Sequence, residues 1–485
     1  MSKFHSTVSR RTFMKALGLT GAGLGAAALT APVFHDLDEL TASGDMANPK
    51  KPWWIKERDL ENPTVEIDWS LIKRFNSTQS TQSNNALYDA NWTQELLDQK
   101  AAKIKWIKEN QPGYTLKDFA YRDTVGLPIG ALNPWVLTGT QIPVNTPEAL
   151  GVPKYQGTPE ENARMLRTAL RTYGAFEIGY VPVTANVLKL MYSNGYTAED
   201  TKTAYIDPVK GNVLPTQGIT SIPIMAPEML SAYKAVPSPL VRGIHEQGNR
   251  INGQVRSSGQ RFLIQLGYQG INGSYGPMPP FLDLSGEGEM GRIGGQTISP
   301  TYGMTQTQNM LSTDLPLAPT HPIDAGIWKF CWTCANCAPT CPSSSNTDAK
   351  EPTWDPPASL NVNSITTPGV YYSGSGKKVF WNNMSTCKSY QDLVWGCNIC
   401  MANCVFTHLE TAMIHQVVKA TLATTPVFDS FFKRMDRFFG YGTQKMFSAG
   451  VGPPTGTFNP KGVDWWTREL PPFSWDGRAD ESHAQ

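Results

Sequence analysis

The chain has 485 residues, which is enough for two or three domains and a large buried core. Its 42 Lys and Arg residues almost balance its 41 Asp and Glu residues, and only 17 % of the chain is charged. This balance argues against nucleic-acid binding, which usually shows a basic surplus. Aromatic residues reach 10 %, so the composition suits an enzyme with a large apolar interior around a bulky ligand.

The N-terminus predicts an export signal. Arg10 and Arg11 stand before an uncharged stretch of Ala, Gly and Leu that runs to Ala31, and this order is the sign of a twin-arginine (Tat) signal. The stretch is shorter than the ~20 strongly apolar residues of a membrane span; a buried N-terminal helix is the alternative. We therefore expect residues 1–31 to be a Tat signal peptide and the mature chain to be soluble by itself.

The following region predicts alternating helices and strands. Residues 91–110 place apolar side chains near one face of a helix. Thr158 and Glu161 form a capping box with Pro159 at the first helical position, and that helix should end at Gly174. Residues 175–181 are strand-like. This order indicates an α/β or α+β layered unit.

Glycine and proline dominate the stretch before the cysteines. Residues 223–240 are Pro-rich and predict a loop, a helix is expected from about residue 253 to 266, and residues 270–303 are rich in Gly and Pro. Glycine lets a backbone approach a bulky ligand closely, although an ordinary surface loop is the alternative. The pattern lacks the strand–G-x-G-x-x-G–helix order of a dinucleotide fold. The glycines expected to contact a cofactor are Gly286, Gly288, Gly291 and Gly294.

All eight cysteines lie in one window and form two motifs. The first motif is Cys331-x2-Cys334-x2-Cys337-x3-Cys341-Pro342, the spacing of bacterial ferredoxins. In such a run three thiolates bind one cubane cluster, and the fourth reaches the other cluster. The second motif is an upstream Cys387 followed by Cys397-x2-Cys400-x3-Cys404.

Exchange of the fourth ligands predicts two [4Fe-4S] clusters that use every cysteine once. Cluster one takes Cys331, Cys334, Cys337 and Cys404, and cluster two takes Cys341, Cys387, Cys397 and Cys400. Four disulfides or zinc sites are the alternatives, but neither explains the spacing and the crossed ligands. If Cys387 is not a ligand, cluster two is a [3Fe-4S] cluster or has a ligand other than Cys.

The Tat signal, the two cysteine motifs and the segments 298–303 and 313–317 closely resemble the catalytic subunit of respiratory, corrinoid-dependent reductive dehalogenases. The resemblance covers nearly the whole chain. It implies an α+β fold with a nitroreductase-like cobamide-binding core and a ferredoxin-like module. The implied domains are the signal (1–31), a corrinoid-binding catalytic region (32–320), the two-cluster module (321–420) and an aromatic-rich extension packed on the core (421–485).

The resemblance also implies the chemistry. Cob(I)alamin would remove halide from a small organohalide, with chloroethenes favoured over haloaromatics, and two clusters would supply electrons. A tyrosine assisted by a cation would protonate the remaining carbon. Tyr268 fits the family's Leu-Gly-Tyr segment and Arg292 is the expected cation, although relatives have an Arg where this chain has residues 304–307. The reserve tyrosines are Tyr233, Tyr275 and Tyr302.

Further expectations concern the surroundings of the cobalt. Trp395 would lie near the substrate pocket, or would only shield a cluster from water. His245-Glu246-Gln247-Gly248 keeps only part of the Asp-x-His-x-x-Gly motif of His-ligated corrinoids, so the cobamide is expected base-off, without a protein His on cobalt.

The expected partners are an upstream respiratory electron donor and a small hydrophobic membrane-anchor subunit, which would hold the enzyme on the outer face of the cytoplasmic membrane. Two other functions stay open from the sequence. One is a relative of epoxyqueuosine reductase, a cytoplasmic corrinoid enzyme. The other is a ferredoxin-type electron-transfer subunit without a corrinoid.

Overall fold

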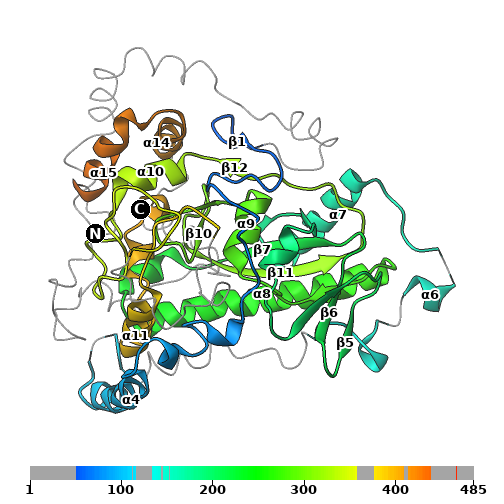
Figure 1. Ribbon diagram of the computed structural model, residues 1–485, viewed down its shortest axis with the longest axis horizontal. Helices are drawn as coiled ribbons and strands as arrows, with labels where there is room; N and C mark the ends of the chain where they lie inside the picture. The colour runs from blue at the N-terminus through cyan, green and yellow to red at the C-terminus, as the bar shows by residue number, and fades with distance from the viewer. Residues whose placement is uncertain are drawn as a thin grey trace.

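The computed structural model describes residues 51–111, 113–115, 134–143, 146–151, 153–357, 376–408, 413–438 and 466. The expected Tat signal at residues 1–31 therefore lies outside the described residues. Figure 1 shows one body that mixes helices and strands, as the sequence pattern indicates. No helix in the described part of the chain is long and apolar enough to cross a membrane.

An antiparallel five-stranded sheet forms the centre of the fold (Figure 1). Its long strands β7 and β11 pair from Thr220 opposite Thr313 to Pro227 opposite Gln306. Short strands complete it, because β2 and β3 pair with the free edge of β7 and β8 pairs with β11. The strands are β2 (Glu177–Ile178), β3 (Val181–Pro182), β7 (Thr220–Pro227), β8 (Ile271–Asn272) and β11 (Gln306–Thr313).

The loop predicted from residue 223 is wrong for residues 223–227, which belong to strand β7. All eight of its residues are buried, and a strand buried on both faces shows a continuous apolar run instead of alternation. Pro223 lacks an N–H for a sheet hydrogen bond. It is tolerated because the edge strand opposite is interrupted there, between Ile178 of β2 and Val181 of β3.

Two helices cover the sheet. Helix α8 (Pro239–Gln265) contacts β7 and β11, and so does α9 (Met278–Ser285). Met310 of β11 packs with Phe281 of α9, whereas its neighbour Leu311 packs with Val255 of α8. Adjacent strand residues point to opposite faces, so α8 and α9 lie on opposite sides of the sheet, as Figure 1 shows.

Helix α8 is much longer than the expected helix at 253–266, although its end at Gln265 agrees. The glycines of α8 weaken the helix signal in its sequence, because Gly lowers helix propensity. Their reason is close packing on the sheet: a Cβ at Gly248 would lie 2.3 Å from Thr307 Oγ1, and one at Gly259 would lie 2.8 Å from Leu311 Cδ1. Tertiary contact thus selects residues that the local helix disfavours.

The other sequence-predicted elements are confirmed. Helix α4 (Trp92–Lys108) matches the prediction for residues 91–110. Helix α7 (Pro159–Thr172) begins with the expected capping box, in which Thr158 Oγ1 accepts from Glu161 N and Glu161 Oε2 accepts from Thr158 N. Strands β2 and β3 occupy the strand-like segment 175–181.

Shorter elements surround this frame. A second sheet has β4 parallel and β5 antiparallel to β6, and two ribbons pair β1 with β12 and β9 with β10. These strands are β1 (Lys56–Glu57), β4 (Tyr196–Glu199), β5 (Tyr205–Asp207), β6 (Gly211–Pro215), β9 (Glu289–Met290), β10 (Thr297–Ile298) and β12 (Ile323–Asp324). The remaining helices are α6 (Pro147–Leu150), α10 (Ile327–Cys334), α11 (Met384–Leu393), α12 (Ile399–Ala402), α13 (Val405–His408), α14 (Met413–Thr424) and α15 (Asp429–Phe438), with 3-10 turns at Ser77–Gln79, Asn85–Leu87, Gly139–Gln141, Val187–Leu190, Leu230–Ala235 and Pro426–Phe428.

The described part of the C-terminal extension contacts the rest of the chain. Phe432 of α15 is buried in the same apolar cluster as Cys331 and Cys334, with Phe428 packed against it. Trp466 packs against a separate cluster that includes Leu240 of α8. The aromatic residues of the tail at positions 439–465 and after 466 lie outside the described residues.

Candidate metal centre

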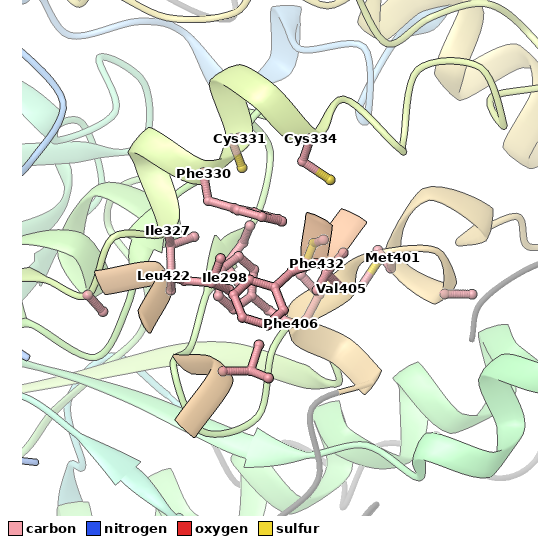
Figure 2. Packing of buried hydrophobic residues seen from close by; sticks show 14 of the residues in the cluster. Ile298, Ile327, Phe330, Cys331, Cys334, Met401, Val405, Phe406, Leu422 and Phe432 are labelled. Atoms are coloured by element: carbon pink, nitrogen blue, oxygen red, sulfur yellow. The ribbon is translucent and has the colours of Figure 1, made fainter. Parts of the chain in front are cut away.

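Four thiols from two distant segments line one pocket. Cys331 and Cys334 lie on α10, Cys337 follows in the next turn, and Cys404 lies between α12 and α13. These four residues, here called the first thiol group, line the pocket together with Arg292 and with the apolar side chains of Ile298, Met304, Phe330 and Phe406. Figure 2 shows Cys331 and Cys334 beside Phe330 at the edge of this apolar cluster.

The other four thiols, here called the second thiol group, also act on one another. Burial, together with the neighbouring Cys387 and Cys341, raises the pKa of Cys400 to about 12. Burial likewise raises the pKa of Cys387 to about 11, with Cys341 adding to the effect. Burial also holds the pKa of Cys397 well above its ordinary value, and Cys400, Cys387 and Cys341 add to this effect.

The two thiol groups lie close to each other. Burial holds the pKa of Cys337 well above its ordinary range, and the thiols that add to this effect include Cys331 from its own group and Cys400 from the second group. The crossed spacing predicts the same two sets of four, and their role as cluster ligands stays a prediction. A metal must displace the protons of such thiols, because only the thiolate is a ligand.

The surroundings supply donors to the sulfur atoms. Ser345 N donates to Cys341 Sγ at 3.3 Å, and Gln391 Nε2 donates to Cys387 Sγ at 3.1 Å. Such hydrogen bonds are one of the ways in which a protein tunes an iron–sulfur cluster. All eight cysteines are free thiols, and within the described ranges no three His, Cys, Asp or Glu side chains stand close enough to hold a single metal ion.

Glu289 fixes the start of the cysteine-bearing helix α10. Its buried carboxylate accepts from the backbone N–H groups of Ala325 at 2.8 Å and Ile327 at 3.0 Å, and from Thr64 Oγ1 at 2.7 Å. A carboxylate at a helix N-terminus is favoured by the helix dipole and satisfies N–H groups that lack helical partners. Burial raises the pKa of Glu289 to about 7. Sequence reasoning missed this role, although an acidic residue inside an apolar, Gly-rich stretch was a signal for it.

Arg292 lies beside the first thiol group and not beside Tyr268. Its guanidinium donates from Nε and Nη2 to the carbonyl of Cys331, at 3.1 and 2.9 Å, and from Nη1 to the carbonyls of Thr347 and Ala349. It also stacks over the Phe380 ring at 3.8 Å. No hydrogen bond or ring contact between described residues joins it to Tyr268, so the structure does not form the expected pair.

Tyr268 sits directly after α8 and is packed as a helix-end residue. Its backbone N donates to the carbonyl of Leu263, and its hydroxyl donates to the carbonyl of Tyr155 at 2.8 Å. Lys154 lies over the ring at 4.5 Å. The ring belongs to the apolar cluster of α7 and α8, whereas the first thiol group borders a different cluster. Its role as proton donor stays a prediction.

Among the reserve tyrosines, Tyr233 shares the apolar cluster of Cys331 and Cys334. Its hydroxyl donates to Glu228 Oε2, and Glu228 Oε1 lies 2.7 Å from His245 Nδ1. Tyr233 and Glu228 are buried, whereas the His245 side chain is 25 % exposed. A continuous chain of polar groups therefore connects the protein surface to this cluster. The two other reserves pack elsewhere: Tyr275 contacts Ser221, and the ring of Tyr302 meets that of Phe176.

Three of the four glycines expected at a cofactor are explained by contacts inside the protein. A Cβ at Gly286, which has φ +74°, would lie 1.9 Å from the carbonyl oxygen of His321. A Cβ at Gly288 or Gly291 would lie within 2.5 Å of Thr297 or Ile298. Gly294 differs, because it borders a small pocket that Gly295, Lys377 and Phe380 also line. Whether any of the four touches a cofactor stays a prediction.

Trp395 faces helix α4. Its ring packs against the small cluster of Trp106 and Tyr114, and Lys103 Nζ lies over it at 4.8 Å. The neighbouring Val394 and Pro237 carbonyls both accept from the Tyr114 hydroxyl. Its place near a substrate stays a prediction.

One face of β11 carries polar side chains with unused hydrogen-bonding atoms. Gln306 Oε1, Gln308 Nε2 and Ser312 Oγ are buried and have no hydrogen-bond partner within the described chain. They occupy alternate positions, so they point to the same face of the sheet. Buried polar atoms without partners are rare in folded proteins, and these suit a ligand rich in amide groups. The alternation of Gln306 and Gln308 was the sequence signal that was overlooked.

Comparison with known proteins gives one consistent result. A family model described as a reductive dehalogenase subunit matches residues 50–211. A chloroethene reductive dehalogenase of Dehalococcoides mccartyi (strain VS) is 29 % identical over 98 % of this chain and 99 % of its own length. A trichloroethene reductive dehalogenase of Dehalococcoides mccartyi (strain ATCC BAA-2266 / KCTC 15142 / 195) is 32 % identical over 97 % of this chain and 98 % of its own length.

Solved structures show the same fold. A catabolic reductive dehalogenase in complex with 3-bromo-4-hydroxybenzoic acid matches 80 % of this chain with a TM-score of 0.54 and 16 % identity. A reductive dehalogenase whose structure is described as suggesting a mechanism for B12-dependent dehalogenation matches with a TM-score of 0.52 and 16 % identity. The match covers 49 % of each of these longer chains.

Proposed function

This chain belongs to the reductive dehalogenase family, and from that membership we propose that it removes halide from a small organohalide of the chloroethene type. It is therefore an oxidoreductase. The observation that carries the substrate class is the near full-length similarity to two enzymes named for chloroethene and trichloroethene. The net reaction consumes two electrons and one proton: the carbon–halogen bond breaks, halide leaves, and a carbon–hydrogen bond forms. Three requirements follow for the chain, namely an electron relay, a halide-removing cofactor and a proton source.

The relay that we propose consists of two [4Fe-4S] clusters. The first thiol group would hold one cluster and the second thiol group the other. The donor set fits, since four thiols line one pocket and four more act on one another close by. The proximity of Cys337 to Cys400 supports electron passage between the two clusters. We also propose that these clusters lie in a ferredoxin-like module, joined to a nitroreductase-like core built on the central sheet.

The cofactor that we propose is a base-off cobamide, which when bound supplies a low-potential two-electron donor at cobalt. The residues that would hold its peripheral amides are Gln306, Gln308 and Ser312, because each has a buried polar atom without a partner among the described residues. His245, the one histidine in a partial cobalt-ligand motif, is engaged with Glu228 at 2.7 Å. That contact supports a cobamide without a protein His on cobalt.

The proton source that we propose is Tyr233, ahead of Tyr268. Its ring lies in the apolar cluster that borders Cys331 and Cys334, whereas the Tyr268 hydroxyl is held by the carbonyl of Tyr155 in another cluster. A hydroxyl that rotates away from Glu228 can deliver its proton to the substrate carbon. Glu228 and the partly exposed His245 behind it form the route by which Tyr233 regains a proton.

The cellular setting is proposed from the sequence. We propose that the protein is exported by the Tat pathway and acts as terminal reductase of anaerobic organohalide respiration. It would receive electrons from an upstream donor and be held at the outer face of the cytoplasmic membrane by a small hydrophobic anchor subunit. Cell fractionation tests this setting: wild-type protein is expected in the membrane fraction outside the cytoplasm, and the Arg10→Lys/Arg11→Lys variant is expected to stay inside.

The substrate proposal is tested by anaerobic assays of the reconstituted protein across a panel of chloroethenes and haloaromatics, with reduced viologen as electron donor. Halide release from chloroethenes in preference to haloaromatics is expected. Release from haloaromatics alone would contradict the substrate class. Cobalt near zero in active protein would contradict the cobamide, and iron far below eight atoms per chain, the content of two cubanes, would contradict the relay.

A further inference from the structure

Arg292 is a buried cation that has no carboxylate partner among the residues that the structure describes. Its side chain is among the largest that are fully buried, with 2 % exposed. Every hydrogen bond of its guanidinium goes to a main-chain carbonyl, and the acceptors belong to Cys331, Trp332, Thr347 and Ala349. Arginine stays protonated in proteins. A full positive charge is therefore fixed inside the protein by groups that carry no charge.

Such a charge is costly unless an anion offsets it. Taking a charged group out of water costs several kcal/mol, and the dipoles of carbonyl groups recover part of this. The carboxylate of Glu289, three residues earlier in the chain, accepts instead from Ala325, Ile327 and Thr64. The burial of Arg292 therefore points to another anion at this place.

The first thiol group supplies that anion once it holds a cluster. Arg292 lines the same pocket as the four thiols, and its charge favours the thiolate form of Cys331. Four thiolates around a [4Fe-4S] core make an anion, and reduction adds one more negative charge. A fixed cation nearby stabilises the reduced form more than the oxidised form.

We propose that Arg292 is a positioning residue that raises the reduction potential of cluster one through its buried positive charge. This proposal rests on the proposed function, in which the first thiol group holds a [4Fe-4S] cluster. Arg292 also ties α10 to residues 347 and 349 through its forked hydrogen bonds, so its charge and its geometry act together.

The surroundings of cluster two differ in this respect. The cation that acts on Cys387 is Lys388, and Lys388 is paired with Asp392 on the same helix. A paired cation exerts a weaker field than an unpaired one. The two clusters are therefore expected to differ in potential, and a change at Arg292 is expected to act mainly on cluster one.

Four variants separate charge from geometry. Arg292→Gln removes the charge but keeps a hydrogen-bond donor, and Phe380→Glu keeps Arg292 but sets a carboxylate where the ring now stacks on it. Arg292→Lys keeps the charge and loses the fork, and Phe380→Leu keeps the charge and loses only the stacking. Each full-length variant is reconstituted with iron and sulfide, its iron is counted, and both cluster potentials are measured by redox titration followed by EPR.

The expected result is a more negative potential for cluster one in Arg292→Gln and Phe380→Glu, with cluster two little changed. Arg292→Lys and Phe380→Leu should stay near wild type. If either Arg292→Gln or Phe380→Glu fails to load iron, the other variant decides. An unshifted cluster-one potential in whichever of these two variants is loaded would overturn the proposal. Wild-type protein that binds no iron would instead contradict the proposed function.

Discussion

Cys404 lines the same pocket as Cys331, although the two residues belong to different cysteine motifs. The fold therefore brings thiols of both motifs together, as the proposed exchange of ligands between the two clusters requires. In the same way, Cys341 of the first motif adds to the raised pKa of Cys387, Cys397 and Cys400. It therefore lies close to these three thiols.

The crossed arrangement of ligands predicts how much iron each double Cys→Ser variant retains. Cys331→Ser with Cys404→Ser should damage one cluster only and leave about half of the iron, because both ligands belong to the first thiol group. Cys331→Ser with Cys341→Ser should damage both clusters. Iron analysis and EPR of the reduced protein measure this. The opposite pattern, with more damage from the Cys331 and Cys404 pair, would show that each motif holds its own cluster.

The proton route predicts a different outcome for two tyrosines. Tyr233→Phe should lower the turnover number by about 10²–10⁴-fold, the usual contribution of a positioned acid, with iron and cobalt content unchanged. Tyr268→Phe should keep most of the turnover, because its hydroxyl is held by the Tyr155 carbonyl. Initial rates of halide release measure both variants. Full activity of Tyr233→Phe, with loss in Tyr268→Phe, would return the donor role to Tyr268.

Glu289 predicts a pH dependence of stability. Burial raises its pKa from 4.5 to about 7 in the folded chain. Between these values the folded state holds a proton that the unfolded state has released, so the free energy of unfolding should fall as pH rises from about 4.5 to 7 and then level off. The loss is on the order of 1–3 kcal/mol.

Denaturant titrations of the metal-free protein between pH 5 and 8 test this, with Glu289→Gln as the comparison. The Gln variant keeps an acceptor for the α10 backbone but does not titrate, so its curve should lack that decline. Parallel pH profiles for the two proteins would show that Glu289 does not titrate in this range.

The close packing of α8 on β11 predicts that adding one methyl group to α8 destabilises the protein. Gly248→Ala should destabilise the protein by roughly 1–3 kcal/mol, the usual cost of overpacking, because the added Cβ meets Thr307 Oγ1 at 2.3 Å. Thr307→Ala in the same chain should recover part of the loss. Gln254→Ala on the exposed side of α8 is the matched control and should change little. A stability gain in Gly248→Ala would mean that helix propensity outweighs the contact.

The sequence predicted those features that local pattern determines. The capping box before α7, helix α4 and the two sets of cysteines depend on spacing along the chain, and spacing is visible without a structure. The length of α8 and the strand at residues 220–227 were missed, because their Gly and Pro residues are explained only by contacts with β11 and by the break between β2 and β3.

The arrangement of the expected site residues could not be predicted from the sequence for a similar reason. Arg292 and Tyr268 were paired from the resemblance to a family, yet they lie in separate surroundings, one beside Cys331 and one beside Tyr155. The link from Tyr233 through Glu228 to His245 joins the turn before α8 to α8 itself. The residue types alone gave no sign of this contact.

The most direct test of the account is a cobalt- and iron-dependent dehalogenation assay of the full-length protein. Anaerobically reconstituted protein, supplied with reduced viologen and trichloroethene, is expected to release chloride and form the product with one chlorine fewer. Omission of either the cobamide or the iron should abolish this release. Chloride release that persists without cobamide, or its absence in fully loaded protein across all chloroethenes, would contradict the account.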